Sequence, residues 1–392
     1  MKKKNFDTLI LQPGKEKPVL QRHHWIFSGA VKTFPDCENG SIVAIKDYQG
    51  HHLGYAYFNR HCSIVARMIS FGQELPEKAL ETNLERAIKL REIFFNGKDN
   101  AYRLINGEGD NLPGLVVDRY NDVLVIQITT LGMEKLKTWL LDWLITRLKP
   151  KSILERSVGP SRRQEGLDDF EAWIYGQALF STEIVENEAH FLVDFTHPQK
   201  TGFYLDQREM RKLVRQLAKG RKVLDCFAYT GAFAVNALIG GAAKVELVES
   251  SPYSLDMAKK NLEKNGFQPD SYRLHHEDVF VFLRQAELDV DFIILDPPAF
   301  AKKKSDLMSA SRGYKDINRL AMLHLPSEGL LLTFSCSHYV DDILFQQILF
   351  KAALEAGKRI RILQRMRHSF DHPLNIFHPE SHYLKGFLLY LD

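Results

Sequence analysis

The sequence lacks features that would each point to a particular class of protein. It has only four cysteines, which are widely spaced and form no Cys-x-x-Cys pair: Cys37, Cys62, Cys226 and Cys336. That scatter argues against a zinc site and against a disulfide framework, and it fits a reducing compartment. No apolar run approaches the ~18 residues of a membrane-spanning helix, and the lysine-rich start has no apolar core of signal-peptide length. We therefore expect a cytoplasmic protein with no bound metal and no membrane partner.

A strong excess of one charge is also missing, since 52 Lys and Arg face 49 Asp and Glu for a net charge of +3. This balance is too mild to establish a nucleic-acid partner. The basic residues are nevertheless clustered in four places: 208–222, 302–304, 162–163 and 358–368. Each cluster alone is most simply solvated surface charge, but together they favour a polyanionic partner.

The chain is too long, at 392 residues, for one ordinary core, so two or three domains are expected. Residues 1–80 alternate short β-like runs with turn signals such as Asn39-Gly40, which is typical of a small β module. Residues 81–187 predict an α+β domain, with helices expected near 76–95 and over 133–148. From 188 to 392 strands alternate with helices, which predicts a parallel sheet with crossover helices and a terminal antiparallel strand.

Acidic residues follow successive predicted strands of the C-terminal domain. The stretch KVLDCFAYTGAFAVNAL (222–238) reads as a strand, a turn and a helix, a unit that binds nucleotide-like ligands. Only Gly231 remains of a Gly-x-Gly pattern, so this motif alone is weak. Glu249 ends the next predicted strand and is placed to accept hydrogen bonds from ribose hydroxyls, and Asp278 ends the third. A single acid most often caps a strand or helix, but this series together with Asp225 favours a ligand pocket.

The fourth predicted strand ends in Asp296-Pro297-Pro298-Ala299-Phe300. Each proline fixes its own φ and restricts the residue before it, so the loop is stiff. A rigid loop at the mouth of a sheet is suited to hold a planar base beside a hydrogen-bonding group. A plain turn would not require an acid ahead of the prolines.

These motifs in this order resemble one family, the bacterial RlmI-type methyltransferases, which make 5-methylcytosine in large-subunit (23S) ribosomal RNA. The resemblance extends over nearly the whole chain and is carried by these segments: RHHWIFSGAV, YRLINGEGDNLPGLVVDRY, RRQEG, QKTGFYLDQREMR, DCFAYTGAFA, DPPAF, MSASRGYKDIN, FSCS and YLKGFLLYL. The chain departs from the pattern at His24, where the family often has proline, and at Ala299, where it often has lysine. Lys302–Lys304 are candidates to replace that lysine.

The resemblance implies an RNA-binding PUA domain over 1–80, a central α+β domain over 81–187 and a class I, Rossmann-like methyltransferase domain with a seven-stranded sheet over 188–392. It implies S-adenosylmethionine as the cofactor and 23S ribosomal RNA as the partner, free or in an assembly intermediate, and leaves a homodimer open. The residues expected at the cofactor are Arg208, Asp225, Phe227, Gly231, Glu249, Asp278 and Asp296. For Arg208, a structural ion pair is nearly as good an interpretation as contact with the methionine carboxylate.

Cys336, at the end of the fifth predicted strand, is the candidate nucleophile. Carbon 5 of cytosine is a poor nucleophile, and a thiolate added to carbon 6 activates it. Asp296 is expected to bond the base and stabilise the adduct, while Cys226 is expected to pack in the core. A second cysteine directly after the Asp-Pro of strand four, found in other RNA cytosine-5 methyltransferases, is here Pro298, so the proton-removing base is not identifiable.

Two other readings remain open at this point. An RNA methyltransferase acting on a base nitrogen would use the Asp-Pro-Pro loop without Cys336. A non-catalytic RNA-binding assembly factor would need no cofactor pocket, which the acids argue against. Ser335, Ser337 and His338 flank the cysteine without an assigned role, and His338 is a candidate for tuning its thiol.

Overall fold

The structure, a computed structural model, describes residues 6–95, 97–197, 200–285, 287–301 and 303–392, which form two compact units. The first unit comprises Met1–Thr182, Val193–Leu205 and Phe370–Ser381, and the second comprises Glu183–Leu192, Asp206–Ser369 and His382–Asp392. Each unit has its own sheets and apolar core. The predicted division into domains at residues 80 and 187 stays a prediction.

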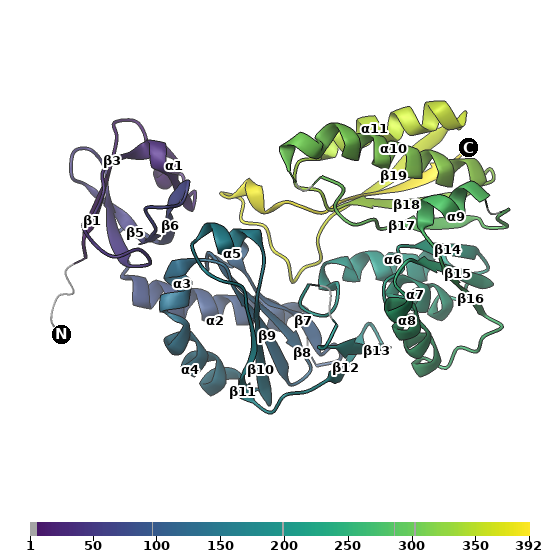
Figure 1. The fold of residues 1–392 in the computed structure, drawn as a ribbon, viewed down its shortest axis with the longest axis horizontal. Helices are drawn as coiled ribbons and strands as arrows, with labels where there is room; N and C mark the ends of the chain where they lie inside the picture. The colour runs from purple at the N-terminus through teal and green to yellow at the C-terminus, as the bar shows by residue number, and fades with distance from the viewer. Residues whose placement is uncertain (1–5, 96, 198–199, 286, 302) are drawn as a thin grey trace. The chain divides into compact units, whose positions relative to one another are not determined.

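The first unit begins with a six-stranded sheet (Figure 1) in the order β2-β6-β5-β4-β1-β3. Its strands are β1 (Thr8–Leu11), β2 (Trp25–Phe27), β3 (Val31–Thr33), β4 (Ile42–Lys46), β5 (His52–Phe58) and β6 (Ile64–Phe71), with the short helices α1 (Lys17–Leu20) and η1 (Ser28–Ala30). Alternating aliphatic residues such as Leu9, Leu11 and Val43 are buried between its curved faces. The predicted β module is thus present.

A five-stranded sheet in the order β11-β10-β9-β8-β7 follows in the same unit. Its strands are β7 (Ala101–Asn106), β8 (Leu115–Tyr120), β9 (Val123–Ile128), β10 (Ser152–Ser157) and β11 (Phe170–Gly176), accompanied by α2 (Pro76–Phe94), η2 (Gly107–Asp110), α3 (Leu131–Lys135), α4 (Lys137–Leu148) and α5 (Pro160–Gln164). The helix expected over 133–148 is broken at Leu136, which has a ψ of 0° and ends α3 before α4 begins. After β11 the chain forms a two-stranded hairpin of β12 (Ser181–Glu186) and β13 (Ala189–Asp194).

The second unit is built on a seven-stranded sheet in the order β16-β15-β14-β17-β18-β20-β19. Its strands are β14 (Lys222–Cys226), β15 (Lys244–Glu249), β16 (Tyr272–His276), β17 (Phe292–Leu295), β18 (Leu330–Ser335), β19 (Ile360–Met366) and β20 (Lys385–Leu391). All neighbours pair in parallel except β20, which is antiparallel to both β18 and β19. This confirms the predicted Rossmann-like sheet with its antiparallel last hairpin.

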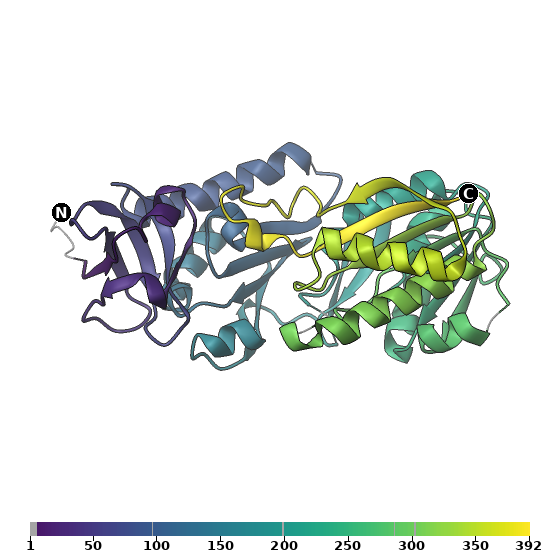
Figure 2. The ribbon, with the colours of Figure 1, turned by 90° about the horizontal axis from the view of Figure 1, so that it is seen from above.

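Helices cover both faces of this sheet, so its central strands are buried on both sides. Figure 1 shows α6 (Arg208–Leu217), α7 (Ala232–Ile239) and α8 (Pro252–Lys264) on one face and α9 (Val279–Gln285), α10 (Leu307–His324) and α11 (Asp342–Ala356) on the other. In Figure 2, α10 and α11 run side by side. Short 3₁₀ turns are η3 (Leu205–Gln207), η4 (Lys304–Asp306) and η5 (Pro379–Ser381).

Local sequence signals explain where these helices start and stop. The hydroxyl of Ser251 accepts a 3.2 Å hydrogen bond from the backbone N–H of Ser254 at the start of α8, and Pro252 occupies the first turn. Gly266 has a φ of +83° just past its end. Within the described ranges, no helix is long and apolar enough to cross a bilayer.

Candidate active site

Asp225 lies within β14, with its side chain buried below the turn that leads into α7. Its Oδ2 accepts a 3.1 Å hydrogen bond from the backbone N–H of Ala234, whereas its buried Oδ1 has no partner among the described residues. Burial raises the pKa of Asp225 to about 8, and the charges of Asp296 and Glu249 add to this increase. The carboxyl group therefore keeps its proton at neutral pH, and its unpartnered oxygen is available to a ligand.

The turn between β14 and α7 holds several residues in the left-handed region. Phe227 (φ +61°) and Tyr229 (φ +48°) are non-glycine residues in this region, and Gly231 (φ +74°) precedes α7. A Cβ on Gly231 would lie 2.9 Å from the Cβ of Ala258, so the turn also needs glycine for its close packing on α8. Strained turns of this kind are concentrated at ligand sites.

Glu249, the last residue of β15, accepts a hydrogen bond from this turn. Its Oε2 accepts a 2.9 Å hydrogen bond from the N–H of Tyr229, and its Oε1 accepts one of 2.9 Å from the N–H of Ser251. Asp278 lies two residues beyond β16, and its Oδ1 accepts hydrogen bonds from the N–H groups of Phe280 and Val281 (2.9 and 3.1 Å) at the start of α9. Both carboxylates thus accept hydrogen bonds from backbone N–H groups, which is the capping role that the sequence offered as the alternative to ligand binding. Their carboxylates also stand at the same end of the sheet as Asp225.

Cys336 follows directly on β18 and lies beside the Asp-Pro-Pro loop that leaves β17. Its Sγ is 3.7 Å from the carbonyl oxygen of Pro297, and the residue is half-buried. β17 and β18 are neighbouring parallel strands, with Leu295 paired to Thr333, so Asp296 and Cys336 leave the same edge of the sheet. The structure therefore brings these two candidate residues together.

The two serines beside Cys336 are buried and anchor the loop that carries it. The Oγ of Ser337 accepts a 3.1 Å hydrogen bond from the N–H of Ala301 and lies 2.9 Å from the hydroxyl of Tyr314 on α10. Tyr314 is fully buried and packs against Phe300, the aromatic residue of the Asp-Pro-Pro loop, with ring centroids 4.5 Å apart and ring planes tilted by 39°. This network ties the cysteine loop, the Asp-Pro-Pro loop and α10 into one rigid group.

Lys385 is a charged residue at this site that sequence reasoning did not single out. It begins β20 opposite Ser335, is only 1% exposed, and its Nζ donates 2.6 Å hydrogen bonds to the carbonyl oxygens of Ser337 and Tyr383. Burial lowers the pKa of Lys385 to about 8, against the attraction of the nearby Cys336, Asp342 and Asp341. The segments that matched the family, YLKGFLLYL and MSASRGYKDIN, contain Lys385 and Tyr314, so the signal was present without an assigned role.

The other candidates near the cysteine are arranged differently. His338 is exposed, and its ring lies edge-on to Tyr339 with centroids 5.4 Å apart. Cys226 is fully buried, and desolvation raises its pKa well above the usual range, as expected for a packing residue. Burial raises the pKa of Cys62 to about 11 and also raises that of Cys37. Cys226 pairs with Leu295 just before the Asp-Pro-Pro loop but is fully buried, whereas the half-buried Cys336 lies against Pro297 of that loop.

The expected surface cluster at 208–222 is partly wrong, because two of its arginines are internal. Arg208 and Arg211 are each 1% exposed and face Glu186, with Arg211 Nη2 at 2.7 Å and Arg208 Nη2 at 3.6 Å from its Oε2. Arg162 is also buried, and it donates to the carbonyl of Ile128 and to Glu134 at 2.8 Å each. These arginines satisfy internal acceptors and cannot contribute to an exposed basic patch. Lys302 lies outside the described residues.

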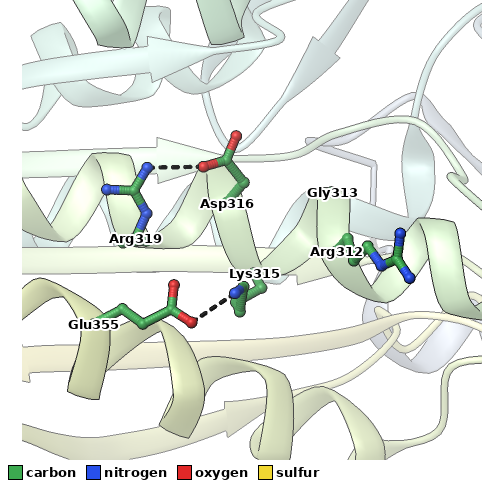
Figure 3. Close-up of a pocket in the computed structure, with 6 residues that line it drawn as sticks. All are labelled: Arg312, Gly313, Lys315, Asp316, Arg319 and Glu355. Atoms are coloured by element: carbon green, nitrogen blue, oxygen red, sulfur yellow. Dashed lines mark hydrogen bonds and ion pairs between the residues drawn. The ribbon is translucent and has the colours of Figure 1, made fainter.

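An open depression on the α10–α11 surface carries basic groups that are accessible (Figure 3). It is lined by Arg312, Gly313, Lys315, Asp316, Arg319 and Glu355. Lys315 pairs with Glu355 at 2.6 Å, and Arg319 pairs with Asp316 at 2.9 Å. Gly313 lies against Phe300, because a Cβ there would be 3.3 Å from that ring. The depression therefore borders the Asp-Pro-Pro loop.

Comparison with known proteins shows which family the whole chain resembles. The model of an S-adenosylmethionine-dependent methyltransferase family matches residues 160–373, and a PUA-like domain matches residues 9–71. A curated protein of Yersinia pseudotuberculosis, ribosomal RNA large subunit methyltransferase I, is 42% identical over 389 residues, covering 97% of this chain and 98% of its own. The same figures hold for its Yersinia pestis counterpart.

Solved structures show the same fold over nearly the whole chain. A putative methyltransferase complexed with SAH has a TM-score of 0.84 at 24% identity, covering 98% of this chain and 99% of its own. A putative SAM-dependent methyltransferase from Streptococcus mutans has a TM-score of 0.80 at 24% identity, with the same coverage. The resemblance predicted from the motifs is thereby confirmed, and the chain belongs to the S-adenosylmethionine-dependent methyltransferase family, in the group that includes ribosomal RNA large subunit methyltransferase I.

Proposed function

We propose that this protein transfers a methyl group from S-adenosylmethionine to carbon 5 of a cytosine in large-subunit (23S) ribosomal RNA, through a covalent bond to Cys336. The ribosomal substrate is supported by the identity to the Yersinia enzymes over nearly the full length of both chains. The choice of carbon 5 is carried by one observation: the half-buried Cys336 thiol stands 3.7 Å from the Pro297 carbonyl at the Asp-Pro-Pro loop.

The turn after β14 fits the cofactor that the family uses. Two buried polar atoms at this turn, the Oδ1 of Asp225 and the hydroxyl of Thr230, have no hydrogen-bond partner among the described residues. Gly231 has no side chain, so its backbone can come close to a ligand. We assign Phe227, Gly231, Glu249, Asp278 and Asp296 to the nucleoside side of the cofactor. We assign Arg208, whose guanidinium also faces Glu186 at 3.6 Å, to the cofactor carboxylate. When bound, the cofactor supplies an electrophilic methyl group.

The residues around Cys336 account for the chemistry on the base. The thiolate lone pair of Cys336 forms a bond to carbon 6, and the carbon 5–carbon 6 π electrons shift toward carbon 5, which becomes nucleophilic. Asp296, when protonated, donates a hydrogen bond to the ring nitrogen, where it stabilises the charge that develops, or its carboxylate accepts one from the amino group. After methylation, loss of the carbon 5 proton restores the double bond and expels the thiolate. Lys385, as a buried cation beside the loop, favours the thiolate form.

Two further features, the PUA-like module and the depression on α10 and α11, are suited to RNA recognition. The target base must leave its stack to reach the sheet edge, so a flipped or single-stranded cytosine is required. We assign phosphate contacts to the PUA-like module and to the basic depression on α10 and α11, which borders the Asp-Pro-Pro loop. Methylation of free RNA and of ribosomal assembly intermediates, compared side by side in vitro, decides which is the substrate.

Substitution of the nucleophile tests the mechanism. Cys336→Ala should abolish methyl transfer while S-adenosylmethionine binding, measured by calorimetry, is retained. Cys37→Ala, in the N-terminal β module, should behave like the unmodified protein. RNA containing 5-fluorocytidine should form a denaturant-resistant adduct, because carbon 5 then carries fluorine in place of the proton whose removal expels the thiolate. Normal turnover by Cys336→Ala would refute covalent attack.

The same experiments separate the competing functions. An enzyme acting on a base nitrogen would need its loop aromatic free to stack on the base, whereas Phe300 packs on Tyr314. Such an enzyme would also keep its activity without Cys336. A non-catalytic assembly factor would show no binding of S-adenosylmethionine in the calorimeter. Mapping 5-methylcytosine in ribosomal RNA from cells that lack this protein would identify the modified nucleotide.

A further inference from the structure

Three potential metal-ligand side chains meet in the first unit, outside the residues assigned to methyl transfer. His23 lies between α1 and β2, whereas His378 and Glu380 lie in the loop that connects β19 to β20. The Nε2 of His23 is 3.2 Å from each carboxylate oxygen of Glu380. The Nδ1 of His378 is 3.5 Å from Oε2 of Glu380. One ligand atom from each of the three residues lies within 4.8 Å of the others.

These separations match the spacing of ligands around a tetrahedral zinc ion. Zinc binds histidine nitrogens and carboxylate oxygens at about 2.0–2.2 Å, so neighbouring ligands of a tetrahedral site are about 3.3 Å apart. The two measured edges, 3.2 and 3.5 Å, bracket that value. The third pair, His23 Nε2 and His378 Nδ1, lies within 4.8 Å, and zinc binding would bring it to the same separation.

Both histidines direct one ring nitrogen at the carboxylate of Glu380. The side chain of His378 is 1% exposed, and its Nδ1 has no hydrogen-bond partner within the described part of the chain. The other ring nitrogen of His23, Nδ1, accepts a 3.2 Å hydrogen bond from the backbone N–H of Trp25 and lies 3.3 Å from the carbonyl oxygen of the same residue. The ring proton of the metal-free protein therefore lies on Nε2, facing Glu380, and zinc would replace this proton when it binds Nε2.

The loop that supplies two of the ligands is held in place by contacts independent of the cluster. The side-chain amide of Asn375 donates to Oδ1 of Asn111 at 2.9 Å, and the amide of Asn106 donates to the carbonyl of Pro373 at 3.1 Å. The carbonyl of Asp371 accepts a 2.7 Å hydrogen bond from the buried Arg91. His378 and Glu380 are thus presented by an ordered segment, so little ordering has to accompany metal binding.

We propose that His23, His378 and Glu380 bind a zinc ion, with water as the fourth ligand. The sequence argument against zinc considered cysteine pairs, and this site uses none. The ion would fasten the β19–β20 loop to the β module that begins the chain, in addition to the proposed methyl transfer. Glu380 is 37% exposed at its side chain, so the ion has access from solvent.

Zinc binding at this site can be tested by measuring the metal content of the untagged full-length protein. After incubation with zinc chloride and dialysis, elemental analysis should find one zinc ion per chain. Substituting cobalt(II) should give the intense visible absorption of a tetrahedral site. His378→Gln and Glu380→Gln should each lower zinc affinity by more than about tenfold, as measured by competition with a chromogenic chelator. His61→Gln, which changes an exposed histidine of the same unit, should leave the affinity unchanged.

The controls make each outcome decisive. Circular dichroism and S-adenosylmethionine binding should be the same in all variants, which shows that lost zinc does not reflect lost folding. Because His378 is buried, the partly exposed Glu380 gives the cleaner variant if His378→Gln fails to fold. Absence of bound zinc in the unmodified protein would overturn the proposal. Equal zinc affinity in Glu380→Gln and His61→Gln, or an octahedral cobalt spectrum, would also overturn it.

Discussion

The ammonium group of Lys385 donates a 2.6 Å hydrogen bond to the backbone carbonyl of Ser337, the residue that follows Cys336. A buried cation is thereby fixed at the loop that carries Cys336, whose Sγ lies 3.7 Å from the Pro297 carbonyl oxygen. Its low pKa of about 8 follows from burial. Lys385 therefore carries its charge at neutral pH but loses it under mildly alkaline conditions.

Lys385→Met should slow methyl transfer and change its pH dependence. Below about pH 8 the charged Lys385 favours the Cys336 thiolate, so removing the charge should lower the single-turnover rate by roughly tenfold or more. In the unmodified protein, the rate should stop rising above about pH 8 as Lys385 loses its proton, and the variant should lack this change. The measurement is the rate of methyl transfer between about pH 6 and pH 10.

A matched lysine provides the control for this experiment. Lys358 also donates to a backbone carbonyl, that of Leu325 at 2.8 Å, but lies two residues before β19 rather than beside the cysteine. Lys358→Met should retain the pH profile of the unmodified protein. An unaltered profile in Lys385→Met would mean that the lysine supports only the fold.

Asp225→Asn should stabilise the protein under alkaline conditions while weakening cofactor binding. The folded chain keeps a proton on Asp225 up to its pKa of about 8, whereas an aspartate exposed to water has a pKa of 3.8. Between these values the folded state binds more protons, so stability falls as pH rises, by up to about 1.4 kcal/mol per pH unit. The asparagine variant stays neutral and should lose this decline. Urea unfolding at about pH 5 and pH 8 measures it.

The exposed Asp270 offers a comparison, since Asp270→Asn should not change the pH dependence of unfolding. Calorimetric titration should show weaker S-adenosylmethionine binding to Asp225→Asn. If that variant and the unmodified protein lose stability equally between the two pH values, the carboxyl group is ionised in the folded state.

The sequence predicted those parts of the site that depend on short-range order. Asp296 and Cys336 each follow an apolar strand, and parallel strands end at a common edge, so their proximity followed from the pattern. Lys385 joins them only because β20 inserts between β18 and β19, a strand order that no local pattern specifies. Arg211 looked like surface charge because its partner, Glu186, is 25 residues away in sequence. Burial of a charged side chain depends on such distant partners.

Gly231→Ala should destabilise the fold for two separable reasons. The residue has a φ of +74°, and its added Cβ would lie 2.9 Å from the Cβ of Ala258. Gly220 has a φ of +72° but no atom within 4 Å of an added Cβ. Gly220→Ala should therefore cost only the conformational penalty, about 1–2 kcal/mol, and Gly231→Ala should cost more in urea unfolding. Ala258→Gly added to Gly231→Ala should recover the difference, and equal costs at the two glycines would contradict the packing argument.

Tyr314 and Ser337 should act as one unit in catalysis. Their hydroxyl oxygens are 2.9 Å apart, and Ser337 also accepts from the N–H of Ala301 next to the Asp-Pro-Pro loop. Tyr314→Phe and Ser337→Ala should each lower kcat with little change in KM, because they loosen the nucleophile loop rather than a binding surface. The double variant should be less impaired than the product of the single effects, with a coupling of roughly 0.5–3 kcal/mol. Independent effects would show that the hydroxyl pair does not position Cys336.

Arg312→Ala should weaken RNA binding and reduce its salt dependence. Arg312 lines the basic depression on α10, next to Gly313, which lies against Phe300. A contact with a single-stranded phosphate releases a counterion, so losing it should reduce the slope of log K against log salt by about 0.7. Lys259→Ala, on α8 and ion-paired with Glu263 at 3.8 Å, should leave the slope unchanged. Fluorescence anisotropy with a ribosomal RNA fragment over a salt series gives both slopes, and equal slopes for Arg312→Ala and the unmodified protein would place the RNA elsewhere.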